Sequence, residues 1–119
     1  AGPPPPSAPL NVLIADDVLI NRKLLKRSLE QALAPASVHF EEAATGEAAL
    51  ELLLNGPTFS LAFLDENYTA TNAAGGHDGL TGTEVTRAYR SFENVSGRAR
   101  RLVIVGVTGN ALPAAHDEH

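Results

Sequence analysis

Short strand-like segments alternate with amphipathic helical segments along this chain, and this alternation constrains the fold more than any other feature. The strand-like segments lie at 11–15, 37–42, 60–64 and 102–107. Helical periodicity occupies 18–33 and 47–54, resumes near residue 83, and a last helix is expected to begin near Ala111 or Pro113. Such alternation predicts an α/β layer fold, with a parallel sheet covered by helices on both faces.

Length and composition narrow the class of protein. A chain of 119 residues with 44% hydrophobic and 19% charged residues predicts one globular domain, which we place at 10–119 behind a proline-rich linker at 1–9. The absence of cysteine excludes disulfides and thiolate metal sites. A net charge of −5 argues against nucleic acid as a partner, and no apolar run approaches the ~18 residues of a membrane span. We therefore expect a cytoplasmic domain without direct membrane contact.

Polar residues end several of the predicted strands. Asp16 and Asp17 follow the first strand, Asp65 the third and Thr108 the fourth. Ligands of parallel sheets bind beyond the carboxyl ends of the strands, so these side chains are expected to converge. Clustered carboxylates repel one another unless one is protonated or a cation binds, and hard oxygen donors suit Mg²⁺. Helix capping is the alternative role of such residues.

Five blocks of the sequence then resemble a known family in order. They are VLIADDVLINRKLLKRSLE (12–30), AATGEAALELL (43–53), LAFLDE (61–66), GTEVTRAYR (82–90) and VIVGVTGNAL (103–112). Together they resemble the response-regulator receiver domain of two-component signalling, in the style of hybrid histidine kinases. The resemblance implies a flavodoxin-like three-layer sandwich with parallel strand order 2-1-3-4, continued in the family by a fifth strand and helix.

The resemblance also implies a role for each polar residue. Asp65 matches the aspartate that accepts a phosphoryl group from a phosphohistidine, so the domain would catalyse its own phosphorylation. Asp17 and Asp16 match the acidic pair that holds Mg²⁺, Asp17 more directly and Asp16 partly through water. Asn67 matches the position whose backbone carbonyl completes the metal shell. Thr108 matches the hydroxyl that moves onto the phosphoryl oxygen when the domain switches conformation.

The sequence departs from the family pattern in two places. The family pairs the phosphoryl group with a lysine at the end of the fifth strand, whereas the lysines here, Lys23 and Lys26, lie in the first predicted helix. We expect that the chain is incomplete at its C-terminus. Residues 103–107 would then form an open sheet edge, covered by a longer chain or by self-association. The glycine that follows the acceptor in the family corresponds to Gly82, which implies an unusually long, mobile loop over 66–81.

Partners and alternatives follow from the same residues. The first predicted helix carries Arg22, Lys23, Lys26 and Arg27, which we interpret as a contact face for an acidic histidine kinase or phosphotransfer protein. The alternatives are a pseudo-receiver that binds partners without phosphorylation, and a flavodoxin-like domain that binds a small ligand. The glycine-rich phosphate loops GxxxxGK[ST] and GxGxxG are absent from the sequence.

Overall fold

A computed structural model describes residues 9–68, 79–97 and 101–107. In chain order its elements are β1 (Leu10–Ala15), α1 (Leu19–Leu33), β2 (Val38–Ala43), α2 (Gly46–Asn55), β3 (Leu61–Asp65), α3 (Gly82–Ser96) and β4 (Val103–Val107). Within these residues, each predicted strand and helix is present, with boundaries shifted by about one residue. Thr108 and the helix expected near Ala111 or Pro113 lie outside the described residues.

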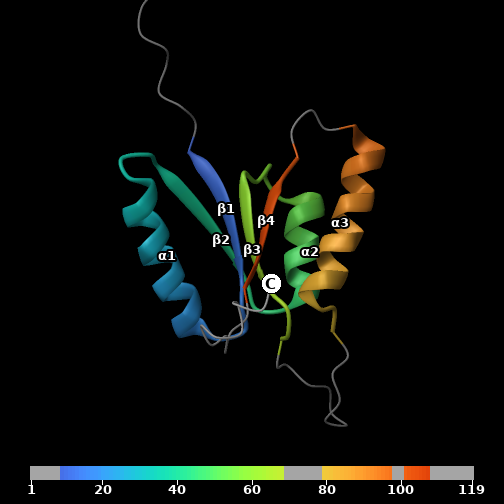
Figure 1. Ribbon diagram of the computed structural model, residues 1–119, viewed down its shortest axis with the longest axis horizontal. Coiled ribbons are helices and arrows are strands. Elements are labelled where there is room, and N and C mark those ends of the chain that lie inside the picture. The colour runs from blue at the N-terminus through green and yellow to red at the C-terminus, as the bar shows by residue number, and fades with distance from the viewer. Residues whose placement is uncertain (1–8, 69–78, 98–100, 108–119) are drawn as a thin grey trace, which may run out of the picture.

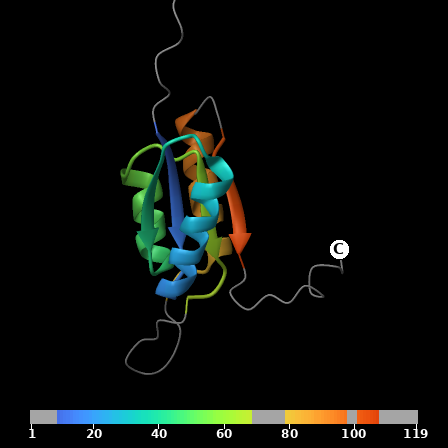
Figure 2. The same cartoon turned by 90° about the vertical axis from the view of Figure 1, so that its left-hand side faces the viewer.

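The strands form one parallel sheet in the order β2-β1-β3-β4, as expected from the resemblance. Helix α1 covers one face of the sheet, and α2 and α3 cover the other (Figure 1). The carboxyl ends of all the described strands therefore lie at the same end of the molecule (Figure 2). That end carries Asp16, Asp17 and Asp65.

The main apolar core lies between the sheet and the α2–α3 layer. Alternate residues of β1 and β3 point into it, among them Leu13 and Leu64, which are almost fully buried. From α3, Val85 and Tyr89 are buried one helical turn apart, as the predicted periodicity required. The spacing of Ala88, three residues after Val85, also predicts a place on this face, but Ala88 is exposed.

The opposite face of the sheet is covered less completely. Val12 and Ile14 are buried there, but α1 contains no buried residue, and Ile20 and Leu24 are 57% and 55% exposed. Ile20 and Leu24 have the four-residue spacing of an apolar helix face, and this part of that face is exposed in the structure. Helix α1 lies over β1 and β2, and no other described helix lies on this face to cover its outer flank (Figures 1 and 2).

Strand β4 forms an edge of the sheet, since β3 is its only neighbour among the described strands. Val103 and Val105 are 56% and 36% exposed. The expectation of a sheet covered on both faces consequently fails at β4, while the expected open edge is present among the described residues. No helix in the described ranges is long and apolar enough to cross a membrane.

Candidate functional site at the carboxyl ends of β1 and β3

Asp16 fixes the turn between β1 and α1. Its carboxylate accepts one hydrogen bond from the Val18 N–H at 2.8 Å and another from the Asn21 side-chain amide at 3.4 Å. The Arg22 guanidinium donates to the Asp16 carbonyl at 2.6 Å. One carboxylate oxygen of Asp16 thus accepts from Val18, which directly precedes α1, and the other from Asn21 within α1, so the acidic turn after β1 is anchored to the start of the helix.

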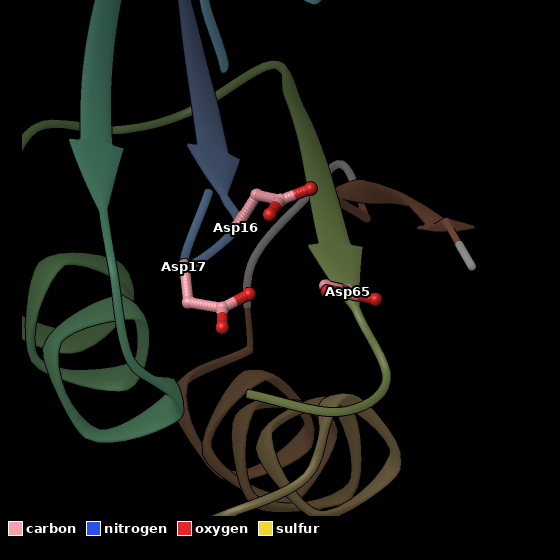
Figure 3. Close-up of side chains that lie close together, drawn as sticks. All are labelled: Asp16, Asp17 and Asp65. Carbon is pink, nitrogen blue, oxygen red and sulfur yellow. The ribbon is translucent and has the colours of Figure 1, made fainter. Parts of the chain in front are cut away.

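Asp65 ends β3, the strand next to β1, and its carboxylate completes a cluster with Asp16 and Asp17 (Figure 3). One carboxylate oxygen from each of the three residues lies within 4.8 Å of the others. Asp16 and Asp65 are each only 6% exposed, and Asp17 is half-buried. The convergence expected for the three carboxylates is therefore present in the structure.

The surroundings of Asp65 disfavour its charge. Burial raises the pKa of the Asp65 carboxyl above its ordinary value, and the neighbouring charges of Asp16 and Asp17 raise it further. The backbone N–H groups of Glu66 and Asn67 offset part of this increase. A cation held by the cluster would instead lower the pKa of Asp65, because its positive charge attracts all three carboxylates.

The amino end of α3 lies directly beside Asp65. The Gly82 N–H donates to the Glu66 carbonyl at 3.0 Å, and the Glu66 carboxylate accepts from the Thr83 N–H and hydroxyl, both at 2.8 Å. A Cβ atom at Gly82 would collide with the Asp65 carbonyl oxygen, so only glycine permits this approach. The resemblance indicated Gly82 but gave no sign of the contact between Glu66 and α3.

Of the other predicted site residues, Asn67 is exposed two positions after Asp65, with its N–H facing the Asp65 carboxylate. Thr108 lies outside the described residues. Sequence reasoning overlooked Tyr68, a buried side chain whose hydroxyl is affected by the charges of the cluster. The sequence offered one indication of Tyr68, its position three residues after Asp65. This spacing alone does not identify a residue as part of the site.

The donor set fits a hard divalent cation. Carboxylate oxygens are preferred ligands of Mg²⁺, which keeps several waters and needs few protein ligands. Each of the three carboxylates of the cluster offers an oxygen that such an ion could bind.

Comparison with solved structures identifies the fold. The chain is similar to a chemotaxis protein CheY4 from Vibrio cholerae, with 23% identity over 93% of this chain and 78% of that one and a TM-score of 0.62. It is also similar to a response regulator receiver protein from Pseudomonas putida, with 21% identity over 93% and 77% of the two chains and a TM-score of 0.61. A mutant receiver domain of the histidine kinase CKI1 from Arabidopsis thaliana has 22% identity over 87% and 68%, with a TM-score of 0.61.

A further similar structure, a fusion with the yeast Spc42 coiled coil, is covered over 60% of its length. No protein-family description and no curated protein matches the chain. At these identities the likeness establishes the fold, which is that of response-regulator receiver domains. The function of the chain depends on the residues of its site.

Proposed function

We propose that this chain is a phosphoacceptor receiver domain that takes a phosphoryl group from a phosphohistidine onto Asp65 with Mg²⁺. The observation that carries the proposal is the cluster of Asp16, Asp17 and Asp65 at the carboxyl ends of adjacent parallel strands. A receiver fold alone would permit many functions, because function depends on the site and not on the fold. The acidic cluster supplies the site.

Phosphoryl transfer requires a nucleophile and a positive charge that neutralises the phosphoryl and carboxylate oxygens. A carboxylate oxygen of Asp65 would attack the phosphorus, forming an O–P bond while the N–P bond to the donor histidine breaks and the imidazole nitrogen keeps the electron pair. A bound Mg²⁺ would supply neutralisation of the phosphoryl oxygens and of the carboxylates. Asp17 and Asp16 would hold that ion, and the backbone carbonyl of Asn67 would complete its shell. Thr108 would donate its hydroxyl to the acyl phosphate and switch the conformation.

Phosphorylation is tested by intact mass after incubation with acetyl phosphate and Mg²⁺. We expect the chain to gain one phosphoryl group, and we expect Asp65→Asn and Asp17→Asn each to abolish the gain. Glu30→Gln, which removes an exposed carboxylate on α1, is the matched control and should leave phosphorylation unchanged. An equal gain in Asp65→Asn would refute the assignment of the acceptor.

A pseudo-receiver is the second candidate, because the exposed Lys23 and Arg27 of α1 could bind a partner whether or not Asp65 is phosphorylated. A pseudo-receiver would still bind Mg²⁺ but would show no mass gain with acetyl phosphate. The same experiment therefore separates the two functions.

We propose a narrower docking face on α1 than its sequence suggested. Arg22 and Lys26 form ion pairs with Glu42 of β2, at 2.9 and 3.0 Å, so their charges are partly satisfied within the chain. Lys23 and Arg27 are exposed, and they share one helical stripe with the exposed Ile20 and Leu24. A basic and apolar stripe suits an acidic phosphohistidine-bearing protein with an apolar centre.

This face is tested by charge reversal. Lys23→Glu and Arg27→Glu should each slow association with acidic histidine phosphotransfer domains and reduce its salt dependence, because steering acts mainly on the association rate. Arg87→Glu, the same reversal at an exposed position of α3, is the control. If Arg87→Glu slows association as much as the α1 variants, the docking face is not on α1.

We further propose that the open edge of β4 pairs with a second copy of the chain. Its exposed backbone and its exposed Val103 and Val105 side chains offer both a hydrogen-bonding ladder and apolar surface. A groove of about 810 Å³ runs along the α3 side of β4, and one of about 310 Å³ lies between α1 and the end of β4.

A further inference from the structure

Glu66 directly follows Asp65 and joins the end of β3 to the start of α3. Its main-chain carbonyl accepts a hydrogen bond from the Gly82 N–H at 3.0 Å. One oxygen of its carboxylate accepts from both the N–H and the hydroxyl of Thr83, each at 2.8 Å. We call these three hydrogen bonds the Glu66–α3 contact.

Capping of α3 does not by itself explain this contact. The helix already has a local capping box, in which the Thr81 hydroxyl accepts from the Glu84 N–H at 3.1 Å and the Glu84 carboxylate accepts from the Thr81 N–H at 2.9 Å. Other N–H groups of a first helical turn can be satisfied by water, and Thr83 is exposed. The Glu66–α3 contact therefore adds a link to the neighbouring strand end that formation of the helix does not require.

The contact holds the main chain that follows Asp65. Asp65 is the last residue of β3 and is in register with Val107 of β4, so the sheet holds the chain up to this point but not beyond it. On the other side, α3 approaches so closely that a Cβ atom at Gly82 would collide with the Asp65 carbonyl oxygen. The main-chain N–H groups of Glu66 and Asn67 face the Asp65 carboxylate. The orientation of this carboxylate thus depends on a turn that Glu66 ties to α3.

We infer that Glu66 is a positioning residue of the acidic cluster. By holding the turn after Asp65, the Glu66–α3 contact keeps an oxygen of Asp65 within 4.8 Å of oxygens of Asp16 and Asp17. The Glu66 carboxylate itself is bonded to α3 and does not belong to the cluster. The inference rests on the proposed function, because the orientation of Asp65 matters for Mg²⁺ binding and for attack on a phosphoryl group.

The experiment compares Glu66→Ala with Glu66→Gln and Glu84→Ala. Both substitutions of Glu66 remove the same negative charge, but glutamine keeps an oxygen that can accept from Thr83. Glu84→Ala is the matched control, because it removes an equal charge and a hydrogen bond to the main chain from the same turn of α3 without touching Glu66. Isothermal titration calorimetry measures the affinity for Mg²⁺. Intact mass measures the rate of phosphorylation by acetyl phosphate, and NMR measures hydrogen exchange of the Asn67 N–H in the metal-free protein.

We expect Glu66→Ala to weaken Mg²⁺ binding about tenfold, as is typical when a residue that orients a metal ligand is removed. Phosphorylation should be slower, and the Asn67 N–H should exchange faster even without Mg²⁺, because the turn is no longer held. Glu66→Gln should restore the affinity and the exchange rate close to their wild-type values. Glu84→Ala should lower the melting temperature, as Glu66→Ala also should, but it should leave the affinity for Mg²⁺ unchanged.

Three results would overturn the inference while leaving the proposed function intact. Wild-type affinity for Mg²⁺ in Glu66→Ala would show that the contact does not position the cluster. An equal loss of affinity in Glu66→Gln would assign the effect to the lost charge, and an equal loss in Glu84→Ala would assign it to the stability of α3. If the wild-type chain binds no Mg²⁺ and gains no phosphoryl group, the proposed function fails and the inference fails with it.

Discussion

Asp65 lies buried beside two other carboxylates, so its charge opposes folding in the absence of a cation. Because burial and the neighbouring charges raise the pKa of Asp65, the folded state binds its proton more tightly than the unfolded state. Stability therefore falls as pH rises from the ordinary value of 3.8 through the raised pKa, and the full penalty persists at neutral pH.

Replacing this carboxyl group should stabilise the free protein. We expect Asp65→Asn to raise the melting temperature at pH 7, with a gain that shrinks as the pH approaches 4. Mg²⁺ should stabilise the wild type more than the variant, since the ion loses a ligand. Thermal unfolding between pH 4 and 8, with Glu30→Gln as control, measures both effects. A gain independent of pH would show that the charge of Asp65 is not the cause.

Glu93 is also a buried carboxylate, but its pKa is lowered, whereas that of Asp65 is raised. Burial raises its pKa, but the Leu102 N–H at 2.7 Å and the Arg90 guanidinium at 2.7 Å outweigh burial, and the net pKa is lowered. Glu93 thereby links α3 to the chain that enters β4. Its contribution to stability is present above its ordinary pKa of 4.5 and is lost as pH falls through the lowered value.

Truncation of Glu93 should be costly. We expect Glu93→Ala to lower the free energy of unfolding by about 3 kcal/mol at pH 7, because it leaves the Leu102 N–H and Arg90 without their acceptor. Glu93→Gln should cost less, since one oxygen remains. Urea denaturation measures the change, and Glu51→Gln, which affects an exposed carboxylate bonded to Asn55, is the control. An equal loss in the control would contradict this role.

At the scale of elements, the amino end of α3 is held against the end of β3 by an approach that only glycine allows. We expect Gly82→Ala to cost about 1–3 kcal/mol, because the new methyl group would collide with the Asp65 carbonyl oxygen and displace the backbone. The same displacement should weaken Mg²⁺ binding. Urea denaturation and Mg²⁺-dependent melting check both effects. Gly106→Ala, where a Cβ meets open space, should leave both nearly unchanged.

The elements and the acidic cluster could be predicted from the sequence because each depends on local pattern. Apolar runs gave the strands, and the rule that parallel strands end together brought Asp16, Asp17 and Asp65 to one place. The hydrogen bonds of Glu66 to α3 and the burial of Tyr68 could not be predicted, because they depend on how α3 approaches β3 in space. The pairing of Arg22 and Lys26 with Glu42 could not be predicted either, because it depends on how α1 lies against β2.

At the scale of the whole molecule, the helices cover the two faces of the sheet unequally. The α2–α3 layer buries the core on one face, while α1 is the one described helix on the other face and covers only part of it (Figure 1). Val103 and Val105 of β4 pair with Leu61 and Phe63 of β3, and all four side chains belong to the face that α1 covers only in part. The molecule thus presents apolar side chains and an unpaired strand edge side by side, a combination that favours pairing with another chain.

We therefore expect this chain to self-associate through β4. Sedimentation velocity over a range of protein concentrations should show a shift from monomer toward dimer. Val105→Lys should return the protein toward monomer, since a charged side chain on an edge strand discourages pairing. Val95→Lys is the matched control, because Val95 is 89% exposed on α3, away from the edge. A wild-type chain that stays monomeric at every concentration, or equal effects of the two lysine variants, would show that β4 is not the interface.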